Sequence, residues 1–222
     1  MNPLPQPPLL VITDRRQAQL SLPEIATAVF AAGGRWLLLR EKDLTHETRT
    51  ALLHELLALA KPYDAFISVS ADVEAARTAH GLHLPRDGDV AAARATLGPD
   101  KLIGFSAHNL REAQVAAAAG ADYVTLSPVF ASRSKPGYGP ALGTDSLGDI
   151  AGRLPVPVIA LGGIEPANAA ACLAAGAAGV AVMGAVMAAH EPGATMAALL
   201  AALRNNGGGE GRRDPHASTG SA

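Results

Sequence analysis

The sequence predicts a single (β/α)₈ barrel, an α/β fold also called a TIM barrel, and three observations predict it. Short apolar runs alternate with longer amphipathic or alanine-rich segments, as expected for parallel strands that are each followed by a helix. Eight such rounds follow one another along the chain. The length of 222 residues is close to the roughly 250 residues of a typical barrel. An open, doubly wound sheet is the alternative fold.

The strands are expected where a short apolar run ends at glycine, proline or a polar residue. These runs cover residues 9–13, 36–39, 65–69, 82–84, 102–105, 123–126, 158–161 and 179–183. Each is a nearly continuous apolar run, which is typical of a parallel strand that is buried on both faces.

The helices are expected between these strands, where proline and glycine mark their ends. Pro23 begins the first helix, and Gly33 and Gly34 end it. Pro166 opens an alanine-rich helix that Gly176 closes, which is the usual order of proline first and glycine last. The other helices are expected at residues 45–61, 72–80, 90–97, 110–119, around 147 and at 194–203.

We expect one domain, at residues 9–204. Residues 1–8, MNPLPQPP, are expected to be a flexible N-terminus without the charged and apolar regions of a signal peptide. From residue 205 the chain turns to glycine, serine and charge, so residues 205–222 are expected to be a disordered tail.

Composition excludes several classes of protein. The net charge is −2 and 17% of the residues are charged, so no basic field attracts nucleic acid or an acidic membrane surface. No apolar run is long enough to span a membrane. Cys172 is the only cysteine, so the chain cannot form an internal disulfide, and we expect a cytoplasmic protein. A homo-oligomer is left open.

Two glycine turns predict a phosphate site. Gly162 and Gly163 follow the seventh expected strand, and Met183 and Gly184 end the eighth. The carboxyl ends of neighbouring barrel strands lie together, and bare backbone N–H groups there can hold an anion. The alternative is that these glycines only make tight turns.

Two other strand ends carry candidates. Arg40 and Lys42 follow the second strand, where they either clamp an anion or form a solvated surface cluster. Ser106 and His108 follow the fifth strand, and a histidine there suits general acid–base catalysis. The alternative is that His108 only helps to begin a helix. His83, inside the fourth strand, is interpreted as a hydrogen-bonded wall residue.

The loop after the sixth strand is longer than a strand-to-helix turn requires. It runs from residue 127 to 143 and contains Ser132, Ser134 and Lys135, whose hydroxyl and ammonium groups suit an anion. A long, glycine-rich loop of this kind is typical of one that covers substrate.

Six stretches of the chain carry a resemblance to a known family. They are ITDRR, LLLREK, HGLHLP, IGFSAHNLREA, GADYVTLSPVFASRSKPG and VIALGGIEPANAAACLAAGAAGVAVMGA. Together they resemble the family of thiamine phosphate synthases and TenI, over residues 9–189. The resemblance implies a TIM barrel that binds a thiazole phosphate, the small-molecule partner expected here, on its last two glycine turns.

The synthases of this family join a pyrimidine pyrophosphate to the thiazole, and their aspartates hold magnesium. By the resemblance, Ser68 and Val69 stand where the synthases have an Asn-Asp pair, and Gly88 stands where they have a second aspartate. Valine and glycine side chains offer no oxygen ligand to a hard cation. We therefore expect neither metal nor cofactor, with magnesium required only if the protein is a synthase.

Three details bear on this expectation. Leu39 is placed where the synthases have a glutamine. Asp87 and Asp89 flank Gly88, so a one-residue shift of the loop restores one metal ligand. Pro85 resembles TenI, because the synthases have glycine there.

The resemblance favours a TenI-like thiazole tautomerase as the function. In TenI, a histidine at the position of His108 moves the proton that makes a thiazole carboxylate phosphate aromatic. Two alternatives stay open. One is a thiamine phosphate synthase that couples hydroxymethylpyrimidine pyrophosphate with thiazole phosphate, and the other is a non-catalytic thiazole-phosphate binder with a regulatory role.

Overall fold

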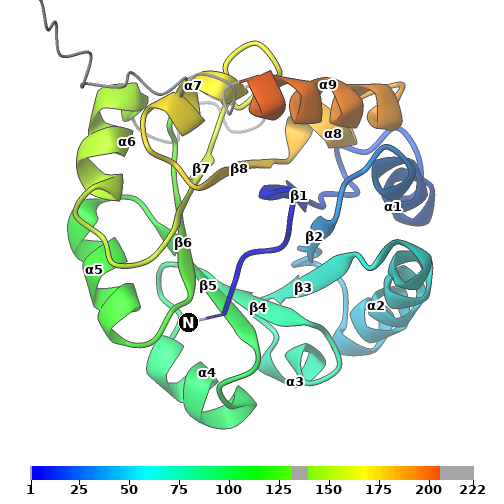
Figure 1. Ribbon diagram of the computed structural model, residues 1–222. Helices are drawn as coiled ribbons and strands as arrows, with labels where there is room; N and C mark the ends of the chain where they lie inside the picture. The colour runs from blue at the N-terminus through cyan, green and yellow to red at the C-terminus, as the bar shows by residue number, and fades with distance from the viewer. Residues whose placement is uncertain (1, 132–139, 206–222) are drawn as a thin grey trace, which may run out of the picture.

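The protein is a closed barrel of eight parallel strands in the order β1 to β8, surrounded by helices (Figure 1). The structure, a computed structural model, describes residues 2–131 and 140–205. The predicted barrel is confirmed, and the open sheet is excluded because β1 pairs with β8 through Leu10 and Ala181. The candidates Ser132, Ser134 and Lys135 lie outside the described residues, as does the predicted tail from residue 206 onward.

The strands lie where the sequence predicts them, with ends that shift by one or two residues. They are β1 Leu9–Ile12, β2 Trp36–Leu39, β3 Phe66–Ser70, β4 Gly81–Leu84, β5 Leu102–Ala107, β6 Tyr123–Leu126, β7 Val158–Leu161 and β8 Gly179–Val182. The extension of β5 has a consequence for the site, because it brings Ser106 into the strand instead of the loop after it.

The helices form an outer ring around the strands (Figure 1). They are α1 Leu22–Ala31, α2 His46–Ala60, the 3₁₀ turn η1 Lys61–Tyr63, α3 Val73–Ala76, α4 Val90–Leu97, α5 Leu110–Ala118, α6 Gly143–Ala151, α7 Ala169–Ala174, α8 Gly184–Met187 and α9 Pro192–Asn205. Side-chain caps explain several starts: Ser21 and Glu24 form a capping box at α1, and Asp89 caps α4 through the N–H of Ala92.

Two helix predictions near the glycine turns were wrong. The helix expected from Pro166 begins at Ala169, because the Asn168 side chain accepts the N–H of Glu165 and donates to the carbonyl of Gly163, which makes a turn first. The short helix α8, which begins at Gly184, was not predicted.

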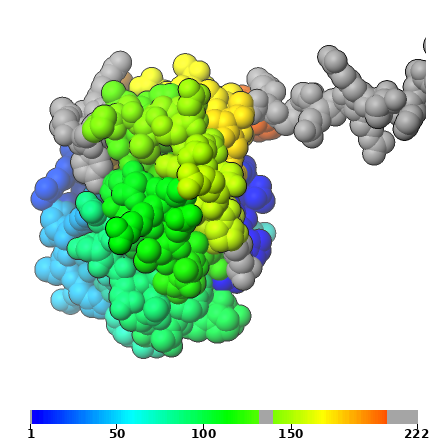
Figure 2. Space-filling view, turned by 90° about the vertical axis from the view of Figure 1, so that its left-hand side faces the viewer, coloured from blue at the N-terminus to red at the C-terminus, as the bar shows by residue number. Residues whose placement is uncertain are grey.

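Two apolar layers hold the barrel together. The larger layer lies between the strands and the helices, and it includes Val69, Leu39 and Cys172. The smaller layer fills the inside of the barrel with side chains such as Trp36 and Tyr123. Alternate residues of each strand face one layer or the other, as the pleat of a strand requires. Figure 2 shows the outer ring from the side, where α5 and α6 cover the strands.

Residues 2–8 cross the amino end of the barrel near its axis (Figure 1). The backbone N–H of Asn2 donates to Asp122 at 2.8 Å, and the Asn2 side-chain amide donates to the carbonyl of Pro99 at 2.8 Å. Asp122 also accepts from Arg94 at 2.6 Å, and Leu4 packs against the inner layer. The sequence-based view of residues 1–8 as a flexible segment therefore needs correction for residues 2–8, which have defined partners.

In the part of the chain that the structure describes, each helix is too short or too polar to traverse a lipid bilayer.

Candidate active site

A cavity of about 1140 Å³ lies at the carboxyl ends of the strands. It is lined by residues that follow all eight strands, so the barrel topology gathers segments that are far apart in the sequence. All the predicted site residues that the structure describes line it: Arg40, Lys42, Ser106, His108, Gly162, Gly163, Met183 and Gly184.

The turn after β7 needs glycine because of its backbone and its neighbours. Gly162 and Gly163 have positive φ angles of +98° and +63°. A Cβ on Gly162 would lie 2.8 Å from Cα of Pro128, and one on Gly163 would lie 2.4 Å from the carbonyl oxygen of Ala131. The turn therefore packs directly against the loop after β6. These glycines do make a tight turn, which was the alternative interpretation from the sequence.

The same turn and the start of α8 also present backbone donors at the cavity wall. The N–H groups of Gly163, Gly184 and Ala185 have no protein acceptor among the described residues. All three residues line the cavity. Backbone donors at a turn and at a helix start are the groups that hold a phosphate ester in many barrels. The predicted phosphate site is thus compatible with the structure and stays a prediction.

His108 is held at both its backbone and its ring. Its N–H donates to the carboxylate of Glu112 at 2.8 Å, and its ring Nδ1 lies 2.8 Å from the carbonyl oxygen of Ser127. A carbonyl oxygen can only accept, so Nδ1 carries the proton and Nε2 of the neutral ring is the proton acceptor. His108 lines the cavity, so an acid–base role is geometrically possible.

A buried polar chain leads from the barrel interior to the cavity. His83 Nδ1 lies 3.0 Å from the Tyr123 hydroxyl oxygen, and His83 Nε2 lies 2.9 Å from Ser106 Oγ. His83 is 4% exposed and Tyr123 is fully buried. Burial and the positive charge of Arg40 lower the pKa of His83 to about 3, so the ring is neutral at working pH. His83 is a hydrogen-bonded wall residue, as interpreted from the sequence.

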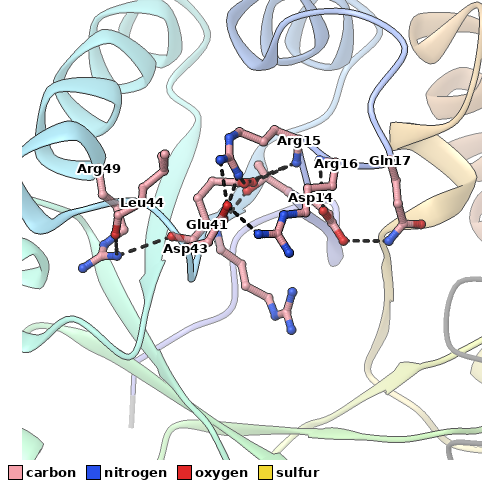
Figure 3. A network of polar contacts seen from close by, with 10 residues as sticks. Asp14, Arg15, Arg16, Gln17, Glu41, Asp43, Leu44 and Arg49 are labelled. Atoms are coloured by element: carbon pink, nitrogen blue, oxygen red, sulfur yellow. Dashed lines mark hydrogen bonds and ion pairs between the residues drawn. The ribbon is translucent and has the colours of Figure 1, made fainter.

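The ends of β1 and β2 are joined by a charged network (Figure 3). Glu41, only 2% exposed, accepts the backbone N–H of Arg15 at 3.2 Å. Asp43 accepts two hydrogen bonds of 2.7 Å from the Arg15 guanidinium, and this pairing lowers the pKa of Asp43 to about 2. Arg40 and Lys42, on either side of Glu41, line the cavity, and their role as an anion clamp stays a prediction.

Comparison with known proteins identifies the family. The family model described as thiamine monophosphate synthase matches residues 9–186. The chain belongs to this family. A thiamine-phosphate synthase of Roseiflexus sp. (strain RS-1) is 38% identical over 91% of this chain and 89% of its own length. The thiamine-phosphate synthase of Roseiflexus castenholzii is 39% identical over 89% and 90%.

A solved structure agrees with this assignment. The thiamine phosphate pyrophosphorylase from Pyrococcus furiosus superposes with a TM-score of 0.81 at 29% identity, covering 89% of this chain and 96% of that one. Membership in the thiamine monophosphate synthase family places the chain among enzymes of thiamine biosynthesis. The tautomerase that the sequence favoured receives no support from these comparisons, whereas the synthase alternative does.

The structure shows which residue of β3 faces the cavity. Val69 packs in the outer apolar layer, whereas its neighbour Ser70 lines the cavity. Ser68 lies inside the barrel and accepts from the indole N–H of Trp36 at 3.3 Å. The strand-three residue that could offer an oxygen to a metal is therefore Ser70, and neither Ser68 nor Val69.

The same distinction applies to the loop after β4. A Cβ on Gly88 would lie 2.8 Å from Cβ of Leu84, so Gly88 packs on the strand end. Asp87 lines the cavity, while Asp89 is used as the helix cap of α4. Of the two aspartates that flank Gly88, Asp87 is therefore the one that lines the cavity, and its role as a metal ligand stays a prediction.

Strand β2 shows the same alternation next to Leu39, the residue compared with the synthase glutamine. Leu39 belongs to the outer apolar layer, and Leu38 lines the cavity. Sequence analysis missed Gln17 as well, whose side chain lines the cavity and donates to Asp14 at 2.6 Å. The signal that could have identified Gln17 was its position five residues beyond the end of β1. In the same way, Ser70 could have been identified because alternate residues of a strand face the same side, and Ser68 faces the inside of the barrel.

Proposed function

We propose that the protein is a thiamine-phosphate synthase that holds a thiazole phosphate in this cavity. The support comes from the family, from relatives of 38% and 39% identity that carry this name, and from one structural observation. That observation is Asp87, whose carboxylate lines the cavity. The sequence had favoured the tautomerase because Val69 and Gly88 stand where the synthases have aspartates, and because Pro85 and His108 resemble TenI.

The donors present fit a magnesium ion of the family type. Magnesium is usually bound by one or two carboxylates together with substrate phosphates and water. Asp87 and the Ser70 hydroxyl are the corresponding donors here. The described residues contain no group of three or more acidic, histidine or cysteine side chains that could hold a metal without a ligand's help. When bound, the ion would neutralise the pyrophosphate of the second substrate.

The chain's own residues would supply the rest of the reaction. The backbone N–H groups of Gly163 and Gly184 would bind the thiazole phosphate and fix the ring nitrogen. Arg40 and Lys42, at the end of β2, would bind the leaving pyrophosphate. The carbon–oxygen bond to pyrophosphate breaks while the bond from the thiazole nitrogen to the pyrimidine methylene carbon forms, so no group on the protein has to remove a proton.

A second function, the thiazole tautomerase, is favoured by the geometry of His108. Its ring Nδ1 donates to the Ser127 carbonyl, and the ring lines the cavity. Aromatisation removes a proton from one carbon and returns one to another, which a neutral imidazole can do. The coupling reaction gives this histidine no comparable role.

Two assays on the purified protein separate these functions. The first follows thiamine phosphate formation from hydroxymethylpyrimidine pyrophosphate and thiazole phosphate with magnesium or with a chelator. The second follows the ultraviolet spectrum of the thiazole carboxylate phosphate. We expect magnesium-dependent product in the first assay. Aromatisation alone would replace the synthase by the tautomerase, and tight thiazole phosphate binding without turnover would indicate the regulatory binder.

Two aspartates of one loop provide a matched test of the metal position. Asp87→Asn removes the carboxylate at the cavity, so we expect coupling to fall by at least about 10²-fold, as for loss of a group that stabilises transition-state charge. Asp89→Asn keeps a good helix cap and should leave coupling unchanged. Equal activity of the two variants would contradict the role of Asp87.

A further inference from the structure

The side chains of Tyr123, His83 and Ser106 form a chain of hydrogen bonds that runs from the barrel interior to the cavity. It joins a fully buried hydroxyl to a histidine that is 4% exposed and then to a serine at the cavity. Both contacts are short, 3.0 Å and 2.9 Å. Thr125, also fully buried, lies with Oγ1 3.4 Å from the same His83 Nε2.

The hydrogens of this chain can be arranged in two ways, according to which ring nitrogen of His83 carries the proton. With Nδ1 protonated, the ring donates to the Tyr123 oxygen, and the Tyr123 hydroxyl hydrogen then has no acceptor among the described residues. The single lone pair on Nε2 accepts from either Ser106 or Thr125. If it accepts from Ser106, the hydroxyls of both Tyr123 and Thr125 are left without acceptors. If it accepts from Thr125, only the Tyr123 hydroxyl is left, but the 2.9 Å contact between Nε2 and Ser106 Oγ then contains no hydrogen.

The second arrangement places the proton on Nε2. Tyr123 donates to Nδ1, and Nε2–H donates to Ser106 Oγ, so both short contacts contain a hydrogen. Only the Thr125 hydroxyl, at the longer distance, is left without an acceptor. This is the only arrangement that places a hydrogen in both short contacts and leaves no more than one buried hydroxyl without an acceptor, so it is the more stable one.

We infer that His83 is a positioning residue, held by Tyr123 in the Nε2–H tautomer, so that Ser106 accepts from His83 and presents its own O–H to the cavity. The ligand atom over Ser106 is then a hydrogen-bond acceptor, such as a phosphate oxygen or an aromatic ring nitrogen. Ser106 is accordingly a donor to the ligand and is not activated as a nucleophile, since activation would require Nε2 to take its proton. This inference rests on the proposed function only for the choice of ligand in the affinity test.

The surroundings of His83 keep the tautomer constant across the working pH range. Burial and the nearby Arg40 charge hold the ring neutral, with a pKa of about 3. Burial, and then the charge of Asp122, raise the pKa of Tyr123, so its hydroxyl keeps its hydrogen. Neither partner therefore changes its proton content near neutral pH.

Nitrogen NMR of ¹⁵N-histidine-labelled protein without ligand tests the inference directly. The two ring nitrogens of a neutral histidine resonate far apart, and the one without a proton lies downfield. We expect the protonated signal at Nε2 and the unprotonated one at Nδ1, assigned by its loss in His83→Gln. A spectrum with Nδ1 protonated would overturn the inference. Because no ligand is present, this result does not depend on whether the protein turns out to be a synthase.

Removal of the tyrosine hydroxyl provides a second test. Tyr123→Phe keeps the aromatic contact with Trp36, whose ring lies 5.0 Å away, but leaves Nδ1 without its donor. We expect the His83 signals to move toward the other tautomer and the affinity for thiazole phosphate to fall about two- to tenfold, the effect of one lost hydrogen bond. Tyr63 contacts Phe30 and does not line the cavity. The control variant Tyr63→Phe should therefore change neither the His83 signals nor the affinity for thiazole phosphate. An unchanged His83 spectrum in Tyr123→Phe would count against the role of Tyr123.

Discussion

The two ends of the barrel use their polar residues in opposite ways. At the amino end, Asp122 is 3% exposed at its side chain and bonds to Arg94, to Asn2 and to the N–H of Ile103. At the carboxyl end, polar side chains such as Asp87 line a large cavity. The first set is satisfied within the protein and the second is directed at a ligand. Stability and activity should therefore separate between the two ends.

The largest effect should come from His108, at the carboxyl end. His108→Gln removes a group that can both accept and donate a proton, so aromatisation of the thiazole carboxylate phosphate should fall by roughly 10²–10⁴-fold. The coupling reaction, which needs no proton acceptor, should change little, and so should the unfolding midpoint. Turnover close to wild type in the ultraviolet assay would show that His108 is structural. His54→Gln, exposed on α2, is the control.

The next largest effect should come from substituting a glycine with a positive φ angle. Such glycines lie at both ends of the barrel, so the two ends can be compared directly. Gly163 and Gly98 have φ angles of +63° and +78°, but a Cβ on Gly98 meets nothing within 4 Å. With ψ −176°, Gly98 adopts a conformation that is nearly confined to glycine, so Gly98→Ala should cost the backbone strain alone, about 1–3 kcal/mol. Gly163→Ala should cost more, because its Cβ would also meet the Ala131 carbonyl at 2.4 Å, and should weaken thiazole phosphate binding. Chemical denaturation and calorimetry measure both, and equal costs would contradict the packing argument.

Substitution of Asp122, at the amino end, should lower the stability of the fold and leave the activity unchanged. Burial alone would raise the pKa of Asp122, but the hydrogen bonds from Ile103, Asn2 and Arg94 outweigh it and lower the pKa below its usual value. Asp122→Asn should therefore cost about 2–3 kcal/mol at pH 7. The exposed Asp149→Asn, which breaks a surface pair with Arg153, should cost under about 0.5 kcal/mol.

The pH dependence follows from the sign of the Asp122 shift. A lowered folded-state pKa means that the stabilisation is complete above the unfolded-state value, near 3.8, and is lost as the pH falls through the lower folded value. The difference in unfolding free energy between wild type and Asp122→Asn should shrink when urea titrations are repeated at pH 3. A difference that stays constant would indicate that the charge of Asp122 is unimportant.

The smallest effect should come from Asn2. Asn2→Ala removes side-chain donors to the carbonyls of Pro99 and Lys101, and should cost about 1 kcal/mol. For a chain of this size the melting temperature should fall by about 2–4 °C. Catalysis should be unchanged, because the cavity lies at the other end of the barrel. A loss of activity would show that the two ends are coupled.

The sequence by itself determined the order of strands and helices, the two glycine turns and the face on which the site lies. These features depend on local properties, namely apolar periodicity, the conformational freedom of glycine, and the rule that parallel strands present their carboxyl ends together. Arg40, Ser106 and His108 were found this way. The amino-terminal segment was not, because a proline-rich stretch has no periodic pattern and the Asp122 that binds Asn2 lies 120 positions away.

Only the tertiary structure decided which of two adjacent residues faces the cavity. Successive side chains of a strand point to opposite faces, so an error of one position exchanges the apolar layer for the active site. For this reason Val69 and Leu39 lie in the apolar layer, whereas their neighbours Ser70 and Leu38 line the cavity. In the loop after β4, Gly88 packs against Leu84, and its neighbour Asp87 lines the cavity. The proposed synthase takes that carboxylate as a metal ligand, so this part of the proposal depends on packing that the sequence pattern does not encode.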